Sequence, residues 1–99
     1  MNIIAVTACP TGIAHTYMAA EQLEKTARKL GHSIKVETQG AMGIENELSE
    51  SDINAATVAI FAADIAIEGV ERFGRIRKIQ VPVQVVLKDP EAVFAQLQP

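Results

Sequence analysis

The residues best able to do chemistry lie together in one short segment, which reads Cys9-Pro10-Thr11-Gly12-Ile13-Ala14-His15-Thr16. Cys9 is the only cysteine of the chain, and it follows an apolar run at residues 3–6 and precedes a helical pattern. A glycine-containing turn that opens a helix presents backbone N–H groups that bind anions and stabilise thiolates. A lone cysteine is more often a small buried apolar residue. Its position here nevertheless favours a nucleophile that accepts a phosphoryl group.

The predicted phosphate cradle comprises residues 10–16. Backbone N–H groups from about residue 11 to residue 16 would hold the phosphoryl oxygens, and three side chains would add donors: those of Thr11, His15 and Thr16. Pro10 stiffens the turn, while Gly12 allows a positive φ.

The loop length also fits a second chemistry. Its pattern Cys-x5-His-Thr resembles the Cys-x5-Arg-Ser/Thr loop of low-molecular-weight tyrosine phosphatases, with His15 in place of the arginine. Histidine cannot supply the bidentate fork that such a phosphatase uses, and a general acid is also needed. Asp89-Pro90 resembles a phosphatase acid loop, but a helix N-cap explains it adequately. A cysteine-dependent phosphatase is thus the second hypothesis, and a thiol redox sensor without a resolving cysteine is the third.

Composition restricts the class of protein. The chain has 99 residues, 48% of them hydrophobic, and a net charge of -3. These values predict one domain over residues 1–99 and no basic surface for nucleic acid. The longest apolar run, residues 55–63, is far short of the roughly 20 residues that span a bilayer. A single thiol and a start that leads directly into a strand favour the cytoplasm.

Four strands are predicted, at residues 2–8, 33–39, 57–63 and 76–81. The first and third are apolar on both faces, which is typical of interior parallel strands. The second alternates, with Lys35 and Glu37 on a solvent-facing side, and is predicted to be an edge strand. Residues 39–48 are expected to form a loop that carries Glu45 and Glu47. Arg72 is expected in a solvated basic cluster.

Helices are predicted between these strands. Apolar spacings of three and four from Ala20 to Leu30 indicate a helix that ends at Gly31. A short helix is expected at residues 51–56, and a last one from an N-cap at Asp89 to about Leu97.

This alternation predicts an α/β fold: an open four-stranded parallel sheet with helices on both faces, a Rossmann-like three-layer sandwich. Placing the two-sided apolar strands in the centre gives the order 2-1-3-4. In such sheets ligands bind beyond the carboxyl ends of the strands, at the switch between strands one and three. Cys9, Gln39, Gly40 and Asp64 follow these ends. They are therefore predicted to share one rim, where protein partners bind.

Residues 8–16, together with Met18-Ala19-Ala20-Glu21, resemble the active-site signature of the fructose-type enzyme IIB of the bacterial phosphoenolpyruvate-dependent sugar phosphotransferase system. Further blocks resemble that family at residues 36–40, 43–48, 62–65, 71–73 and 87–92. The resemblance covers nearly the whole chain, and its first motif is highly specific.

The resemblance implies a phosphoryl carrier, which is the first hypothesis. Cys9 matches the family's phosphocysteine. It would take phosphate from a phosphohistidine of enzyme IIA and pass it to a fructose-like sugar in the membrane component, enzyme IIC. The protein would then work at the inner face of the membrane through enzyme IIC. No cofactor or metal is indicated, because no cluster has ligand spacing and backbone dipoles can suffice.

Overall fold

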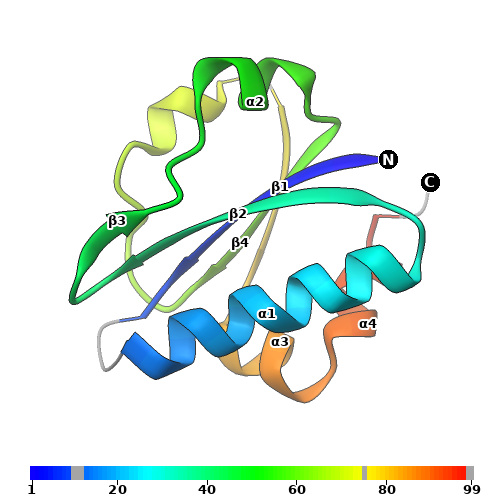
Figure 1. Cartoon of the computed structure of the whole chain (residues 1–99), viewed down its shortest axis with the longest axis horizontal. Coiled ribbons are helices and arrows are strands. Elements are labelled where there is room, and N and C mark those ends of the chain that lie inside the picture. Colours follow the sequence, from blue (N-terminus) through cyan, green and yellow to red (C-terminus); the bar gives the residue numbers. More distant parts are fainter. Residues whose placement is uncertain (10–12, 75, 98–99) are drawn as a thin grey trace.

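A computed structural model describes residues 1–9, 13–74 and 76–97. Its centre is a five-stranded sheet in the order β3-β2-β1-β4-β5 (Figure 1). The strands are β1 (Asn2–Ala8), β2 (Ser33–Gly40), β3 (Gly43–Glu45), β4 (Val58–Ala63) and β5 (Arg77–Val81). Neighbouring strands run parallel except β2 and β3, which are antiparallel. The predicted α/β fold and the 2-1-3-4 order of its four strands are confirmed, and β3 is an addition to them.

Helices cover both faces of the sheet, as Figure 1 shows. On one face lie α1 (Ile13–Lys29), α3 (Val83–Lys88) and α4 (Pro90–Ala95). On the other lie α2 (Glu50–Ala55) and the 3-10 turn η1 (Val70–Phe73), which the sequence did not predict. Asp89 caps α4 as expected, since its carboxylate accepts a hydrogen bond from the Ala92 N–H at 3.3 Å.

Two apolar clusters, one on each face, hold these layers together. Alternate residues of β1 and β4 point to opposite clusters, so Ile3 and Ile60 join the cluster that contains Leu23 of α1. Phe61 joins the other cluster and meets the ring of Phe73 edge to face, with 4.9 Å between ring centroids. Burial on both faces explains why these two strands are continuous apolar runs.

The prediction that residues 33–39 form an edge strand was wrong. The chain turns back after β2, and Gly40 pairs with Gly43, whose φ of 87° lies in the left-handed region that glycine tolerates. The expected loop at residues 39–48 therefore contains β3. This strand has only three residues, all exposed, so it leaves no periodic pattern in the sequence.

The charged side of β2 is covered rather than solvated. The side chain of Glu37 is fully buried, and that of Lys35 is partly buried against Asp52, with 2.7 Å between Nζ and Oδ2. α2 and η1, which follow β2 in the chain, pack over this charged side of the strand. Alternation of charged and apolar residues identified the strand correctly but could not show what covers its charged side.

The contact with Lys35 belongs to the start of α2. The Ser49 hydroxyl accepts from the Asp52 N–H at 3.1 Å, and the Asp52 carboxylate accepts from the Ser49 N–H at 2.8 Å. These two bonds form a capping box. Hydrogen bonds from Lys35 and from Ser49 lower the pKa of Asp52 from 3.8 to about 2.

We expect Asp52→Asn to lower the free energy of unfolding at neutral pH. A carboxyl whose pKa is lowered by folding stabilises the protein fully above its unfolded pKa of 3.8, and loses this effect as the pH falls through about 2. The difference from wild type should therefore narrow over that interval in urea unfolding curves followed by circular dichroism. Ser51→Asn changes an exposed neighbouring position, and its free energy of unfolding should differ from wild type by an amount that does not depend on pH. A pH-independent difference for Asp52→Asn would contradict this account.

Both described ends of the chain lie at the edge of the sheet opposite to the carboxyl ends of the parallel strands (Figure 1). The Met1 carbonyl accepts from the Ser33 N–H at 3.1 Å, where β2 begins. Arg77, where β5 begins, donates to the Leu97 carbonyl at 3.4 Å. No helix within the described ranges is long and apolar enough to cross a membrane.

Candidate active site

The carboxyl ends of the central strands meet at one cavity of about 440 Å³. Its lining residues are Cys9, Gln39, Gly40, Ala41, Gly43, Ile65, Ala66 and Glu68. Cys9 directly follows β1, while the lining residues of β2 and of the segment after β4 stand on either side of it. The strand order therefore brings Cys9, Gln39 and Gly40 to one cavity, whereas Asp64, predicted on the same rim, is not among its described lining residues.

Cys9 is largely enclosed, with 6% of its surface exposed. Helix α1 begins four residues later, and its first turn carries Ala14 and His15, both exposed. The amino end of a helix presents unpaired N–H groups and a partial positive charge that favour an anion. The predicted cradle residues Pro10, Thr11 and Gly12, and the side chain of Ile13, lie outside the described part of the structure.

The start of α1 is fixed against β1 by two threonines. The Thr7 hydroxyl donates to the Thr16 carbonyl at 3.1 Å, and both residues are buried. A methyl group added at Gly40 would lie 3.4 Å from the Thr16 hydroxyl oxygen, so that side chain lies close to the end of β2. Thr16, predicted as a phosphate donor, is only 2% exposed. Its hydroxyl thus lies beside the lining residue Gly40 and largely away from solvent.

Gln39 joins the end of β2 to the segment after β4. Its amide nitrogen donates to the Glu68 carbonyl at 3.0 Å, and its amide oxygen accepts from the Glu68 N–H at 2.9 Å. The same nitrogen also donates to the Glu37 carboxylate at 2.7 Å. Gln39, predicted as a partner-binding residue, is 6% exposed and makes these three bonds within the protein.

A buried ion pair lies beside Gln39. Two nitrogens of the Arg72 guanidinium meet the two carboxylate oxygens of Glu37, each at 3.0 Å. Arg72 also donates to the carbonyls of Gly69 at 2.8 Å and Glu68 at 3.2 Å. The guanidinium carbon lies 5.0 Å from the centre of the Phe73 ring. The expectation that Arg72 belongs to a solvated basic cluster was therefore wrong.

Electrostatics keep this pair charged. Burial alone would raise the pKa of Glu37, but hydrogen bonds from Arg72, the Leu48 N–H and Gln39 outweigh it and lower the pKa below 4.5. The hydrogen bond to Glu37 raises the pKa of Arg72 against the opposing effect of burial. Sequence reasoning missed this pair because Glu37 and Arg72 are 35 residues apart. The one sequence signal that included both residues was the resemblance of residues 36–40 and 71–73 to the enzyme IIB family.

The two aspartate candidates do not line the cavity, although the Asp64 N–H donates to the carbonyl of Ala8, the residue before Cys9, at 3.0 Å. Asp64 is exposed at the end of β4, and its carboxylate accepts from the Val83 N–H at 3.2 Å, at the start of α3. Asp89 lies at the other end of α3, where it caps α4. Neither carboxylate is among the lining residues of the described cavity.

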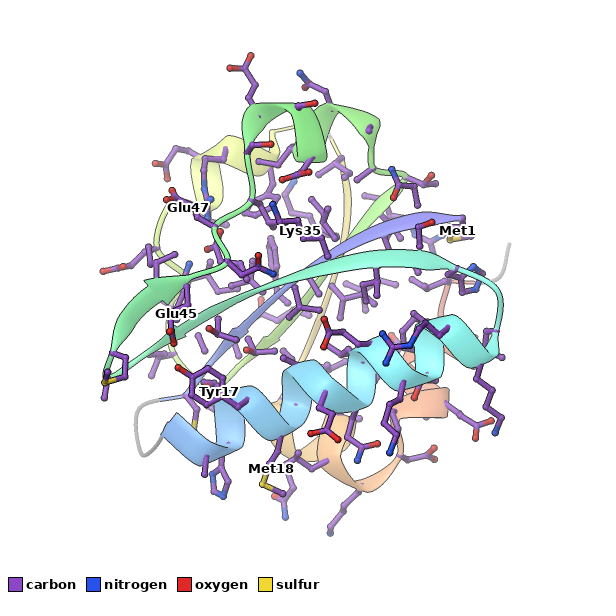
Figure 2. All side chains as sticks on the ribbon, viewed as in Figure 1. Met1, Tyr17, Met18, Lys35, Glu45 and Glu47 are labelled. Carbon is purple, nitrogen blue, oxygen red and sulfur yellow. The ribbon has the colours of Figure 1, made fainter. Side chains whose placement is uncertain are left out.

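The outer part of the rim is formed by α1 and β3. Figure 2 shows Tyr17 of α1 and Glu45 of β3 pointing toward one another, and the Tyr17 hydroxyl donates to the Glu45 carboxylate. Met42, in the turn before β3, is 67% exposed, and Ile65, on the opposite side of the cavity, is 43% exposed. Glu45, expected in a solvated loop, therefore bonds across this rim, which also presents apolar side chains to solvent.

Comparison with known proteins decides the family. Residues 4–96 match the family described as PTS system, Lactose/Cellobiose specific IIB subunit. The chain belongs to the PTS IIB family. It is 46% identical to the PTS system fructose-like EIIB component 2 of Escherichia coli (strain K12), over 98% of this chain and 92% of the relative. The predicted membership of a fructose-type IIB family is confirmed.

Longer relatives contain a IIB domain within a fused protein. The chain is 54% identical to part of the PTS system 2-O-alpha-mannosyl-D-glycerate-specific EIIABC component of Escherichia coli (strain K12). That match covers 96% of this chain but only 14% of the relative.

Solved structures of IIB domains have the same fold. A domain of the fructose-specific IIABC component of Borrelia burgdorferi is 46% identical, with a TM-score of 0.90 over 95% of this chain and 89% of that one. A predicted fructose-specific IIB of Escherichia coli is 45% identical, with a TM-score of 0.91 over 95% of this chain and 83% of that one. As a PTS IIB domain, the chain is a component of a sugar phosphotransferase.

Proposed function

We propose that this IIB domain carries a phosphoryl group on Cys9, taking it from a phosphohistidine of enzyme IIA and passing it to a fructose-like sugar bound by enzyme IIC. The observation that carries the proposal is the position of the only thiol, in a cavity at the carboxyl ends of β1 and β2 and four residues before α1. Relatives in which IIA, IIB and IIC are fused support the choice of partners.

The transfer consists of two displacements at phosphorus. The Cys9 thiolate attacks, the P–N bond of the donor breaks, and its electron pair returns to the imidazole nitrogen, which takes up a proton. In the second step a sugar hydroxyl oxygen attacks, the S–P bond breaks, the thiolate is regenerated and the hydroxyl proton is released. The backbone N–H groups predicted to form the cradle, at about residues 11–16, stabilise the charge on the phosphoryl oxygens in both steps.

A carrier must hold the phosphocysteine without hydrolysing it. Hydrolysis by a cysteine phosphatase needs a carboxyl group that protonates the leaving alcohol and then, as carboxylate, takes a proton from the water that attacks the phosphocysteine. Asp64 and Asp89 make hydrogen bonds to the N–H groups of Val83 and Ala92, and neither lines the cavity. These positions argue against either aspartate as the acid of a cysteine-dependent phosphatase. Glu68 is the one acidic residue among the described lining residues, and the hydrolysis assay tests its role.

The test compares transfer with hydrolysis. The probe is the IIA domain of the mannosylglycerate EIIABC relative, phosphorylated on its histidine. We expect one phosphoryl group per chain, located at Cys9 by mass spectrometry, and no turnover of an aryl phosphate above that of buffer. Rapid release of inorganic phosphate from the labelled protein would instead favour the phosphatase.

The sugar is tested separately. IIC components from the mannosylglycerate EIIABC relative and from a fructose-like relative would each be supplied with the phosphorylated protein. We expect phosphate to reach sugar through the fructose-like IIC component. Transfer only through the mannosylglycerate component would identify a different substrate and leave the role of Cys9 unchanged.

A further inference from the structure

One wall of the Cys9 cavity is a segment without helix or strand, residues 65–69, which is separated from the end of β4 by Asp64. Three of its residues line the cavity: Ile65, Ala66 and Glu68. All three are exposed, and only Ile67 of this segment packs against an apolar cluster. Apolar burial therefore contributes little to holding this wall in place.

The side chain of Gln39 connects this wall to the end of β2. Its amide bonds both the N–H and the carbonyl of Glu68, as a neighbouring strand would, although residues 65–69 are not a strand. The Gln39 side chain thus bonds the backbone of residue 68 in the way that a strand would. No strand of the described sheet pairs with this segment. Here we call these two bonds the Gln39 clip.

The ion pair behind Gln39 fixes the orientation of the clip. The Glu37 carboxylate can only accept, so the Gln39 amide nitrogen must face it, and the amide oxygen is left facing the Glu68 N–H. Arg72 holds the same carboxylate and also bonds the carbonyls of Glu68 and Gly69. A fully satisfied polar network of this kind holds its members rigidly.

We propose that Gln39 is a positioning residue for phosphoryl transfer, because its clip sets the place of the cavity wall at residues 65–69 against which the donor protein docks. The inference rests on the proposed function of Cys9. Its consequence is specific: the wall governs how the partner fits, whereas Cys9 is held by β1 and α1. A displaced wall should therefore weaken productive docking more than it slows transfer within the docked complex.

Gln39→Glu gives the direct test. It keeps the size of the side chain but replaces the amide NH2 with an oxygen, so the bonds to Glu37 and to the Glu68 carbonyl are lost while an oxygen still faces the Glu68 N–H. With the phosphorylated IIA domain of the mannosylglycerate relative as probe, we expect KM to rise about tenfold or more, and the rate at saturation to change by less than about threefold. Gln39→Met removes both clip bonds, and it should show the same rise in KM together with faster hydrogen exchange of the Glu68 amide.

Two further variants keep the test decisive. Gln39→Asn retains the amide but is one methylene shorter, and should show the same split between KM and rate if Gln39→Glu does not fold. Lys35→Met breaks an ion pair on the same side of the same strand without touching the wall, and should leave both values unchanged.

An unchanged KM together with accelerated Glu68 exchange would overturn the proposal, because the wall would then move without consequence for docking. Unchanged Glu68 exchange in Gln39→Met would also overturn it, because the clip would not hold the wall. If wild-type Cys9 accepted no phosphate from the probe, the proposed function itself would fail, and with it the role assigned to Gln39. The exchange measurement would still report whether the clip holds the segment.

Discussion

Cys9→Ser should abolish phosphoryl transfer while leaving the fold intact. Serine is similar in size to cysteine and fits a site that is 6% exposed, but its hydroxyl is not ionised near neutral pH and is a poor nucleophile without a base. Loss of a covalent nucleophile costs about 10³-fold or more in rate. Transfer from the phosphorylated IIA domain to sugar, followed with labelled phosphate, measures this directly.

The matched control is Thr7→Ser, a change close to the site that keeps the hydroxyl bonded to the Thr16 carbonyl. It should retain transfer within a few-fold, and amide spectra should match wild type for both variants. A Cys9→Ser protein that accepts phosphate and still delivers it to sugar would show that another residue is the carrier.

Arg72→Met should cause the largest loss of stability of any single substitution considered. It leaves the carboxylate of Glu37, which is fully buried, without its ionic partner. Breaking a fully buried pair costs about 3–5 kcal/mol, and because the Arg72 side chain is 23% exposed, we expect a loss near the lower end of that range. For a domain of this size each kcal/mol corresponds to roughly 4–8 °C in Tm. Thermal and urea unfolding would both detect such a change.

The pH dependence of this stability loss shows whether it comes from the ion pair with Glu37. Because the folded protein lowers the pKa of Glu37, its contribution to stability is complete above the unfolded value of 4.5 and is lost as the pH falls through the folded value. The difference between wild type and Arg72→Met should therefore shrink on acidification. The double variant Glu37→Gln/Arg72→Met, which buries no charge, should recover much of the loss at neutral pH.

Arg77→Met is the control for loss of a guanidinium. Arg77 is exposed and donates only to the carbonyls of Gln96 and Leu97 among its described bonds. It should change the free energy of unfolding by less than about 1 kcal/mol. Equal effects of Arg72→Met and Arg77→Met would mean that the buried pair contributes no more than a surface charge.

The fold was predictable where a pattern reflects burial directly. β1 and β4 are apolar on both faces because helices cover both sides of the sheet, and this alone identified them as central. β3 was not predictable, because three exposed residues bury too little to leave a pattern. Glu37 was misjudged for a related reason: a charged residue on alternate positions looks the same whether water or Arg72 lies beyond it.

The candidate site was predictable in its location and less so in its internal contacts. Carboxyl ends of neighbouring parallel strands must meet, so Cys9, Gln39 and Gly40 could be assigned to one rim from the strand order alone. The bonds of Gln39 and Arg72 to the segment at residues 65–69 depend on how a loop folds over the sheet. Local sequence carries no period or spacing that encodes such contacts.

The short hairpin at the end of the sheet has a consequence for solubility. An open sheet invites strand addition along its outermost strands, which can lead to polymers. Here one outermost strand, β3, has only three residues, Gly43–Glu45, and is followed by the left-handed Asn46. The other, β5, begins with exposed Arg77 and Lys78, charges that discourage a second chain from pairing. Both outermost strands of the sheet thus discourage self-association along its sides.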